Sequence, residues 1–304
     1  MPAIAYLNRL LPGLQPLLKY RAEDWPHDFS AGLSVAAVSI PVAIAYAEVA
    51  GLSPSAGLYS SILPMIVYAL AGTSRQMIIG PDAATCAMIA AVVAPLAAGN
   101  SGVYLSFSIA LTLLTGIFCI AASFLRLGGL ADFLARPILV GLLNGISLSI
   151  MVGQVGKVLG SKGQASRFFR QLLEIPELVL QAHVPTVLLS LGCVLVMSVM
   201  PRLSKRIPAS LVTMILAALA AYSLRLDEMG VALIGPVASG LPTLDWPELQ
   251  LHEVGDLAGS AAGLGLVLFT SGMLTARSLA ERNRYDSDVD REFAAFGMAN
   301  IVSA

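Results

Sequence analysis

The sequence predicts an all-α integral membrane protein. Hydrophobic residues make up 57% of the 304 residues and charged residues only 12%, about half the charged share of a soluble domain, which is roughly a quarter. Apolar runs recur at close to the length of about 20 residues that crosses a bilayer as a helix. Lys and Arg gather between these runs. Together the three observations favour a chain that is folded in lipid.

Eight membrane spans and the start of a ninth are predicted from these runs. They cover residues 30–50, 57–71, 77–97, 103–125, 137–159, 185–200, 208–224, 257–276 and 293 onward. Residues 1–28 lack the order of regions found in a signal peptide and are predicted to be a cytoplasmic N-terminal segment. A stretch rich in Pro and Gly, residues 231–247, is predicted to be extended and to lie in an extracellular linker, residues 225–256.

The placement of basic residues predicts a cytoplasmic N-terminus in the cell (inner) membrane. With that orientation, five of the 18 Lys and Arg residues lie outside, which leaves 13 in the cytoplasm, where they are normally retained. The five are Lys157, Lys162, Arg167, Arg170 and Arg225. Four of them lie together between the fifth and sixth spans, which makes the excess of basic residues on the cytoplasmic side smaller and the prediction of orientation weaker.

Several other functions find no support in the residue patterns. There is no phosphate-cradling loop and no His-Glu-x-x-His helix, and the three histidines have no nucleophile beside them in sequence. Cys86, Cys119 and Cys193 lie inside apolar runs and far apart, which favours small core residues over a metal site. We therefore expect no enzyme activity and no metal or other cofactor. The expected partner is a lipid bilayer and not a nucleic acid.

Helix breakers inside three spans point to a solute site. Pro41, Pro64 and the pair Gly80-Pro81 each interrupt an otherwise apolar run. Broken helices at membrane depth are tolerated where they line a cavity, and transporters aim the resulting half-helix ends at a solute. A harmless kink is the alternative for any single proline.

The start of the third span is the sharper candidate. Residues 80–85 read Gly-Pro-Asp-Ala-Ala-Thr, which predicts a proline in the first helical turn followed by small residues and open backbone N–H groups. Such a helix end binds anions. Ala83 and Ala84 would let a solute approach the backbone, and the Thr85 hydroxyl would add a hydrogen bond. The alternative is an ordinary helix start packed against protein.

Two carboxylates are candidates for proton coupling. Asp82 either lines this site, where it would exchange a proton or bind a cation, or only stabilises the first turn. Glu48 lies near the end of the first predicted span. An ionisable group within a span usually faces a cavity or a partner. The alternative for Glu48 is a place at the membrane interface, where its charge costs little.

The motifs along the chain resemble the SulP (sulfate permease) family of anion transporters. The matching residues, in the family's order and spacing, are Ile40-Pro41, Tyr46, Gly51, Gly57-Leu58-Tyr59, Pro64, Tyr68, Gly72-Thr73-Ser74-Arg75, Gly80-Pro81-Asp82, Leu233, Gly235, Gly240-Leu241-Pro242, Ala276-Arg277, Asn283, Tyr285, Gly297 and Asn300. The resemblance extends from about residue 25 to the end of the chain.

The resemblance implies a fold of two inverted repeats of seven spans. It assigns residues 29–126 and 257–304 to a core domain and residues 137–224 to a gate domain, with the solute held in the core. By matching position it implies substrate-binding roles for a set of residues on the first, third and eighth spans. These are Pro41, Ala43, Tyr46, Asp82, Ala83, Thr85, Ser271 and Thr275. A homodimer of the full-length protein is also implied.

Two departures from the family pattern qualify this expectation. Many members of the family carry an acid where this chain has Ser271. Proton coupling in this chain is therefore assigned to Glu48 or Asp82 instead. The chain ends at Ala304, so we expect a truncated transmembrane domain that lacks the tenth span and the cytosolic STAS domain. The expected function is alternating-access transport of an inorganic or small organic anion, sulfate or bicarbonate first, by proton symport or anion exchange. The alternatives are a fragment that transports nothing and a nucleobase-type permease.

Overall fold

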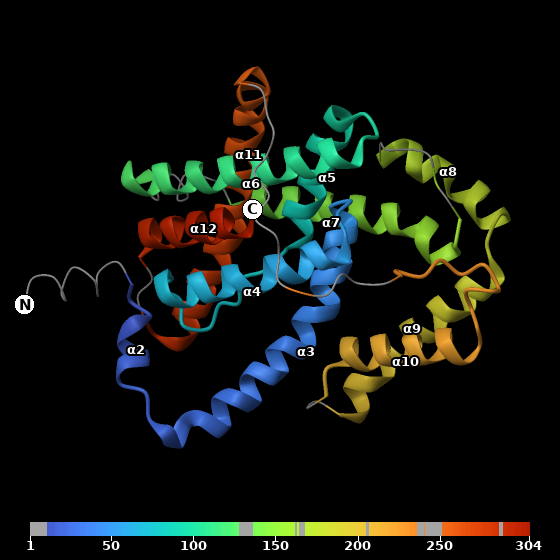
Figure 1. The fold of residues 1–304 in the computed structure, drawn as a ribbon, viewed down its shortest axis with the longest axis horizontal. Helices are drawn as coiled ribbons and strands as arrows, with labels where there is room; N and C mark the ends of the chain where they lie inside the picture. The colour runs from blue at the N-terminus through green and yellow to red at the C-terminus, as the bar shows by residue number, and fades with distance from the viewer. Residues whose placement is uncertain are drawn as a thin grey trace, which may run out of the picture. The chain divides into compact units, whose positions relative to one another are not determined.

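The computed structural model describes residues 11–127, 136–161, 163, 168–204, 207–235, 240, 251–285 and 288–304, and every regular element in these ranges is a helix (Figure 1). The elements, in chain order, are α2 (Leu14–Leu18), the short 3-10 helix η1 (Ala22–Asp24), α3 (Trp25–Val49), α4 (Pro54–Ala71), α5 (Ala83–Ala97), α6 (Ser101–Phe124), α7 (Arg136–Leu159), α8 (Phe168–Leu180), α9 (Val184–Leu203), α10 (Ala209–Ser223), α11 (Leu251–Asn283) and α12 (Val289–Ser303).

Each predicted span corresponds to a helix, with some differences at the ends. Five of the described helices are long and apolar enough to cross a membrane, and three shorter apolar helices accompany them. The predicted gap between the fifth and sixth spans contains a helix that we did not expect, the 13-residue α8. The predicted extended stretch has no regular structure over 231–235. Apart from Gly240, its remaining residues lie outside the described ones.

The chain divides into two compact units. The first contains residues 1–27, 43–141 and 239–304, and the second contains residues 28–42 and 142–238. One boundary crosses α3 between Val42 and Ala43, so residues 28–42 of this continuous helix belong to the second unit. The division into core and gate domains stays a prediction.

In the first unit, α12 lies between α4 and α6, and α11 packs on α6 and α5 (Figure 1). One apolar cluster joins α5, α6 and α11 through Val93, Ala97, Phe107, Ala110, Leu111, Leu257, Ala261 and Leu264. A second cluster is centred on the stacked rings of Phe269 and Phe293, whose centroids are 3.5 Å apart. A third joins α4 and α12 through Tyr68, Ala71, Ala295 and Phe296. The burial of α12 follows from its contacts on several sides.

The contact between α6 and α12 depends on two glycines. A methyl group on Gly116 would lie 2.8 Å from the carbonyl oxygen of Gly297, and one on Gly297 would lie 2.7 Å from the carbonyl oxygen of Gly116. Real side chains do not approach a backbone oxygen this closely. Small residues of this kind let two membrane helices pack backbone to backbone. The two helices are thereby held at a spacing that only glycine permits.

In the second unit, α7 and α9 are connected through a tight turn and α8. The turn uses Gly160, whose φ of +71° favours glycine. The N–H of His183 donates to the carbonyl of Leu159 at 2.8 Å, and the Ser161 hydroxyl donates to the carbonyl of Leu178 on α8 at 3.1 Å. These bonds fix α8 against the turn before α9 begins.

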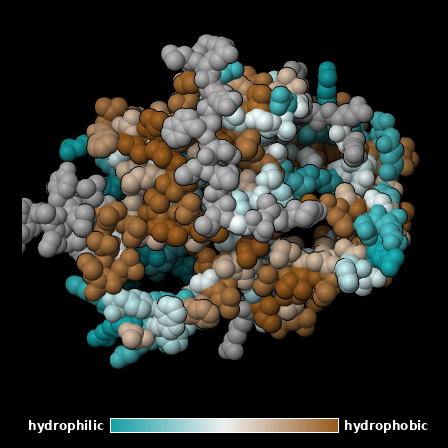
Figure 2. All heavy atoms as spheres, in the orientation of Figure 1, coloured by the Kyte–Doolittle hydropathy of each residue, from teal (hydrophilic) through white to brown (hydrophobic). Residues whose placement is uncertain are grey.

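Apolar side chains cover much of the described surface, as Figure 2 shows for one face. The helix α9 has no buried residue, although its side chains are mainly apolar. Large exposed residues on it include Leu188, Leu191 and Leu195. A surface of this kind is unfavourable in water and is expected for helices that face lipid or further membrane helices.

Candidate functional site

The third span is broken where the sequence places Gly80-Pro81. Residues 77–82 are not helical, and α5 begins only at Ala83, after Asp82 in an extended conformation with φ −120° and ψ 155°. A residue before proline is driven away from the helical region, and proline itself has no N–H to donate. The break therefore leaves a half-helix of 15 residues that begins inside a predicted span.

Asp82 is the N-cap of this half-helix. Its Oδ1 accepts hydrogen bonds from the N–H of Ala84 at 2.9 Å and of Thr85 at 3.1 Å, and its Oδ2 accepts one from the Thr85 hydroxyl. Asp is among the residues most favoured at this position because its carboxylate satisfies first-turn donors. Asp82 thus stabilises the start of α5 from one residue before the first turn.

This geometry corrects two details of the expected anion site. Pro81 precedes the N-cap and is not in the first turn. The amides of Ala84 and Thr85 are not open, because the Asp82 carboxylate already occupies them. Asp82, Ala83 and Thr85 are each half-buried, whereas Ala84 is buried. The structure brings the predicted residues of the third span together at the first turn of α5. The carboxylate of Asp82 lies where a transported anion was expected to bind.

The predicted residues of the first span lie along the second half of α3. Pro41 is inside the helix and half-buried, and Tyr46 is half-buried as well. Ala43 is 1% exposed, and its carbonyl oxygen lies directly against Gly57 of α4. Glu48 is exposed, one residue before the helix ends. Ala43 therefore takes part in the contact between α3 and α4.

The predicted residues of the eighth span use their hydroxyl groups within α11. Ser271 donates to the carbonyl of Leu268 at 3.2 Å, and Thr275 donates to the carbonyl of Ser271 at 3.0 Å. Ser271 is half-buried and Thr275 is exposed. Among the described residues, no group of three or more His, Cys, Asp or Glu side chains is placed to hold a metal ion.

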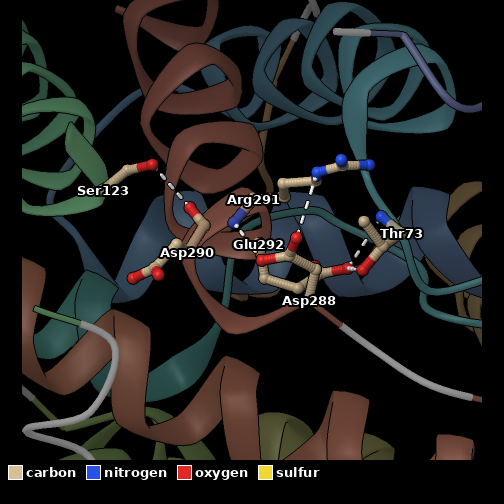
Figure 3. A network of polar contacts seen from close by, with 6 residues as sticks. All are labelled: Thr73, Ser123, Asp288, Asp290, Arg291 and Glu292. Atoms are coloured by element: carbon tan, nitrogen blue, oxygen red, sulfur yellow. Dashed lines mark hydrogen bonds and ion pairs between the residues drawn. The ribbon is translucent and has the colours of Figure 1, made fainter. Parts of the chain in front are cut away.

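Sequence reasoning missed the most buried carboxylate among the described residues, Glu292 on α12, which is 0% exposed. Its Oε1 accepts from the N–H of Thr73 at 2.8 Å, from the Thr73 hydroxyl at 2.5 Å and from the N–H of Ser74 at 2.8 Å. Its Oε2 accepts from the Tyr68 hydroxyl at 2.7 Å. Figure 3 shows Glu292 pointing at Thr73 from the start of α12. We call this arrangement the Glu292 clasp.

Further polar contacts surround the clasp. The hydroxyls of Ser74 and Tyr285 are 2.9 Å apart and share a hydrogen bond, and the guanidinium of Arg75 lies 6.0 Å from the centre of the Tyr285 ring. Asp288 caps α12 and forms an ion pair with Arg291 at 3.0 Å (Figure 3). The Gly-Thr-Ser-Arg motif thus contacts Tyr285, in the segment before α12, through one hydrogen bond and one ring contact, in addition to its bonds with Glu292.

The signal for the clasp was present in the sequence only in part. Residues 72–75 contain three side chains with hydrogen-bond donors, and Glu292 directly precedes the apolar run of the last span. Periodicity gives no information on pairs that are 219 positions apart. The acid falls in a predicted gap between spans, and the structure shows that it is nevertheless fully buried.

Comparison with known proteins identifies relatives over nearly the whole chain. The model of the sulfate permease family matches residues 26–304. A probable sulfate transporter of Mycobacterium tuberculosis is 39% identical over 292 residues, which cover 96% of this chain and 52% of the relative. Low affinity sulfate transporter 3 of Stylosanthes hamata is 32% identical, over 99% of this chain and 50% of the relative. The chain spans about half the length of these curated relatives.

Solved structures share the fold. The murine Solute Carrier 26 family member A9 anion transporter in the inward-facing state superposes with a TM-score of 0.89 at 22% identity, over 98% of this chain and 53% of that chain. The transmembrane domain of a cyanobacterium bicarbonate transporter, BicA, superposes with a TM-score of 0.81 at 24% identity, over 93% of this chain and 73% of that chain. The all-helical arrangement is therefore that of known transporters.

Proposed function

This chain belongs to the sulfate permease family, and from that premise we propose that the complete protein is a secondary transporter for an inorganic or small organic anion. Sulfate and bicarbonate are the first candidates, because the relatives named above are a probable sulfate transporter and a sulfate transporter, and one structural neighbour is a bicarbonate transporter. The proposed location is the cell (inner) membrane with the N-terminus in the cytoplasm, and a homodimer is the proposed assembly.

The observation that carries the proposal is the half-helix α5. A helix that begins at Ala83 has its electropositive end within the third predicted span. A negative group is favoured at such an end, and Asp82 occupies it in this structure. We propose that the transported anion is held beside this end, where the Thr85 hydroxyl, which donates to Asp82 in this structure, would turn to the anion, and that α3 and α11 contribute the remaining contacts.

Alternating access is the proposed transport cycle, driven by proton symport or by exchange of one anion for another. For symport, Glu48 and Asp82 are the proposed proton carriers, because the family pattern implies an acid at the position of Ser271, which has no proton to exchange. The match of the family model over residues 26–304 supports an anion over a nucleobase as the solute. No step of this cycle needs an enzyme activity.

Uptake into liposomes tests the proposal. The complete protein is reconstituted, and uptake of labelled sulfate and of labelled bicarbonate is measured with an inward proton gradient, with an internal anion for exchange and with neither. We expect uptake of at least one anion that saturates with concentration. Uptake equal to that of empty liposomes for both anions under all three conditions, with folded protein, contradicts the proposed function.

A further inference from the structure

We propose that Glu292 is a positioning residue for transport, which holds the segment leading into α5 and so fixes where the half-helix begins. The effect on transport rests on the proposed function, whereas the positioning itself is a property of the fold. The segment in question, residues 73–82, is the connection between α4 and α5 and ends at the cap residue Asp82.

The donor set identifies Glu292 as a structural acceptor. Four hydrogen bonds from Tyr68, Thr73 and Ser74 reach its two oxygens. Two of the donors are backbone N–H groups, which can only donate, so an acceptor must be present at this buried place. A buried donor that loses its partner costs more free energy than an average hydrogen bond contributes. The clasp is therefore costly to open.

The segment is held at two further places beyond the clasp. Met77 and Ile79 pack against the apolar cluster formed by Tyr68, Ala71, Ala295 and Phe296. Beyond them, Asp82 caps α5 and its carbonyl accepts from the N–H of Cys86 at 3.0 Å. Residues 77–81 are not helical, so their path depends on these anchors. Glu292 supplies the polar anchor at the start of the segment, and Asp82 supplies the one at its end.

The same geometry distinguishes a positioning role from proton transfer. In Glu292→Gln, the amide oxygen can keep the three bonds to Thr73 and Ser74, while the amide NH₂ donates to the Tyr68 hydroxyl, which accepts as well as donates. Glu292→Ala leaves the two backbone N–H groups unpaired. A positioning residue should thus tolerate Gln and not Ala, whereas a proton carrier should tolerate neither.

Native cysteines allow the positioning to be measured without transport. Cys86 is buried in the first turn of α5, and Cys119 is buried in α6, where it reports on the whole unit. The complete protein in liposomes is treated with N-ethylmaleimide, and modification of each cysteine is followed by mass spectrometry. We expect Glu292→Ala to raise the rate at Cys86 about tenfold, with Cys119 unchanged and Glu292→Gln within about twofold of the wild type.

A milder variant covers the case in which Glu292→Ala does not fold. Tyr68→Phe removes one hydroxyl donor from the clasp and keeps the ring, and we expect it to raise the rate at Cys86 about threefold while Cys119 stays unchanged. A wild-type rate at Cys86 in Glu292→Ala, or in Tyr68→Phe where the former does not fold, overturns the proposal. Equal acceleration at Cys86 and Cys119 also overturns it, because Glu292 would then support the whole fold.

Transport supplies the second readout. We expect Glu292→Ala to lower kcat/KM of anion uptake about tenfold, while Glu292→Gln keeps both the rate and its dependence on pH. A flattened pH profile in Glu292→Gln overturns the positioning role in favour of proton transfer. If the wild-type protein moves no anion, the proposed function fails by itself, and the cysteine rates still decide whether Glu292 positions α5.

Discussion

At the scale of single residues, the protein uses two carboxylates as internal partners of backbone N–H groups. Asp82 accepts from the first turn of α5, and Glu292 accepts from Thr73 and Ser74. For the first, the sequence left two roles open, a residue that lines the solute site and one that only stabilises the first turn, and the structure shows it as the N-cap of α5. The second was not found, because its partners come from a distant segment. A hydrogen bond between near neighbours in sequence, such as a helix cap, can be predicted from the sequence, whereas a bond between distant segments depends on how the helices pack.

Substitution of Asp82 separates its capping from its charge. Asp82→Ala removes the cap and should lower the free energy of unfolding by about 1 kcal/mol, whereas Asp82→Asn keeps a side chain that caps equally well. If the anion binds beside the same helix end, loss of the negative charge in Asp82→Asn should also lower the KM for uptake. Thermal unfolding in detergent and concentration-dependent uptake measure the two effects. A raised KM in Asp82→Asn would contradict an anion at this end.

Glu48 is tested by its effect on coupling. If Glu48 carries the proton in symport, Glu48→Gln should abolish the pH dependence of uptake and leave anion binding measurable, because the amide has no proton to exchange. Uptake is measured across a pH series in both proteins, with Asp82→Asn as the parallel variant for the other candidate. An unchanged pH dependence in Glu48→Gln removes Glu48 from the mechanism.

At the scale of helices, the sequence predicted most spans but not all of their ends. Apolar runs located α4, α6, α9 and α10 closely, since a membrane helix must bury its backbone in apolar side chains. The helix α8 was missed because its 13 residues are too short for a span and mix apolar with charged residues. The third span was predicted to begin at residue 77, six residues before α5, because its apolar run starts there, whereas the helix start predicted within residues 80–85 contains the observed one at Ala83.

The glycine contact between α6 and α12 gives a prediction at this scale. Gly116→Ala should lower the free energy of unfolding by about 1–3 kcal/mol, because its methyl group would press on the backbone of α12. The same change at Gly192 of α9 is the control, since a methyl group there meets nothing within 4 Å. Thermal unfolding in detergent compares the two. Equal stability of both variants would show that α6 and α12 move apart at no cost.

At the scale of the whole molecule, several hydrogen bonds join span ends and gaps that the predicted topology places on the same side of the membrane. The gap after the second span and the gap before the ninth are both predicted to be cytoplasmic, and the Glu292 clasp joins them. The Ser123 hydroxyl at the end of α6 donates to the carbonyl of Asp290 at 2.6 Å, which adds a third gap on that side. On the other side, the Tyr104 hydroxyl donates to the carbonyl of Ala50 at 2.5 Å.

The orientation of the chain in the membrane can be tested by labelling cysteines from outside the cell. Gln76 and Ser101 are both exposed and belong to gaps predicted to lie on opposite sides. In intact cells, a membrane-impermeant maleimide should modify Ser101→Cys and not Gln76→Cys, and both should react after the membrane is opened. The unsubstituted protein, with Cys86 and Cys119 buried, gives the background. The reverse pattern would place the N-terminus outside.

The position of Glu292 late in the chain has a consequence for biogenesis. Its partner Thr73 is 219 residues upstream, so at a translation rate of about 5 to 20 residues per second the loop after α4 waits roughly 11 to 44 s for its acceptor. During that interval its donors have to be satisfied by water, lipid headgroups or an insertion factor. The newly made polypeptide thus passes through a stage in which its first helices are in the bilayer but not yet locked together, and cellular quality control would meet it there.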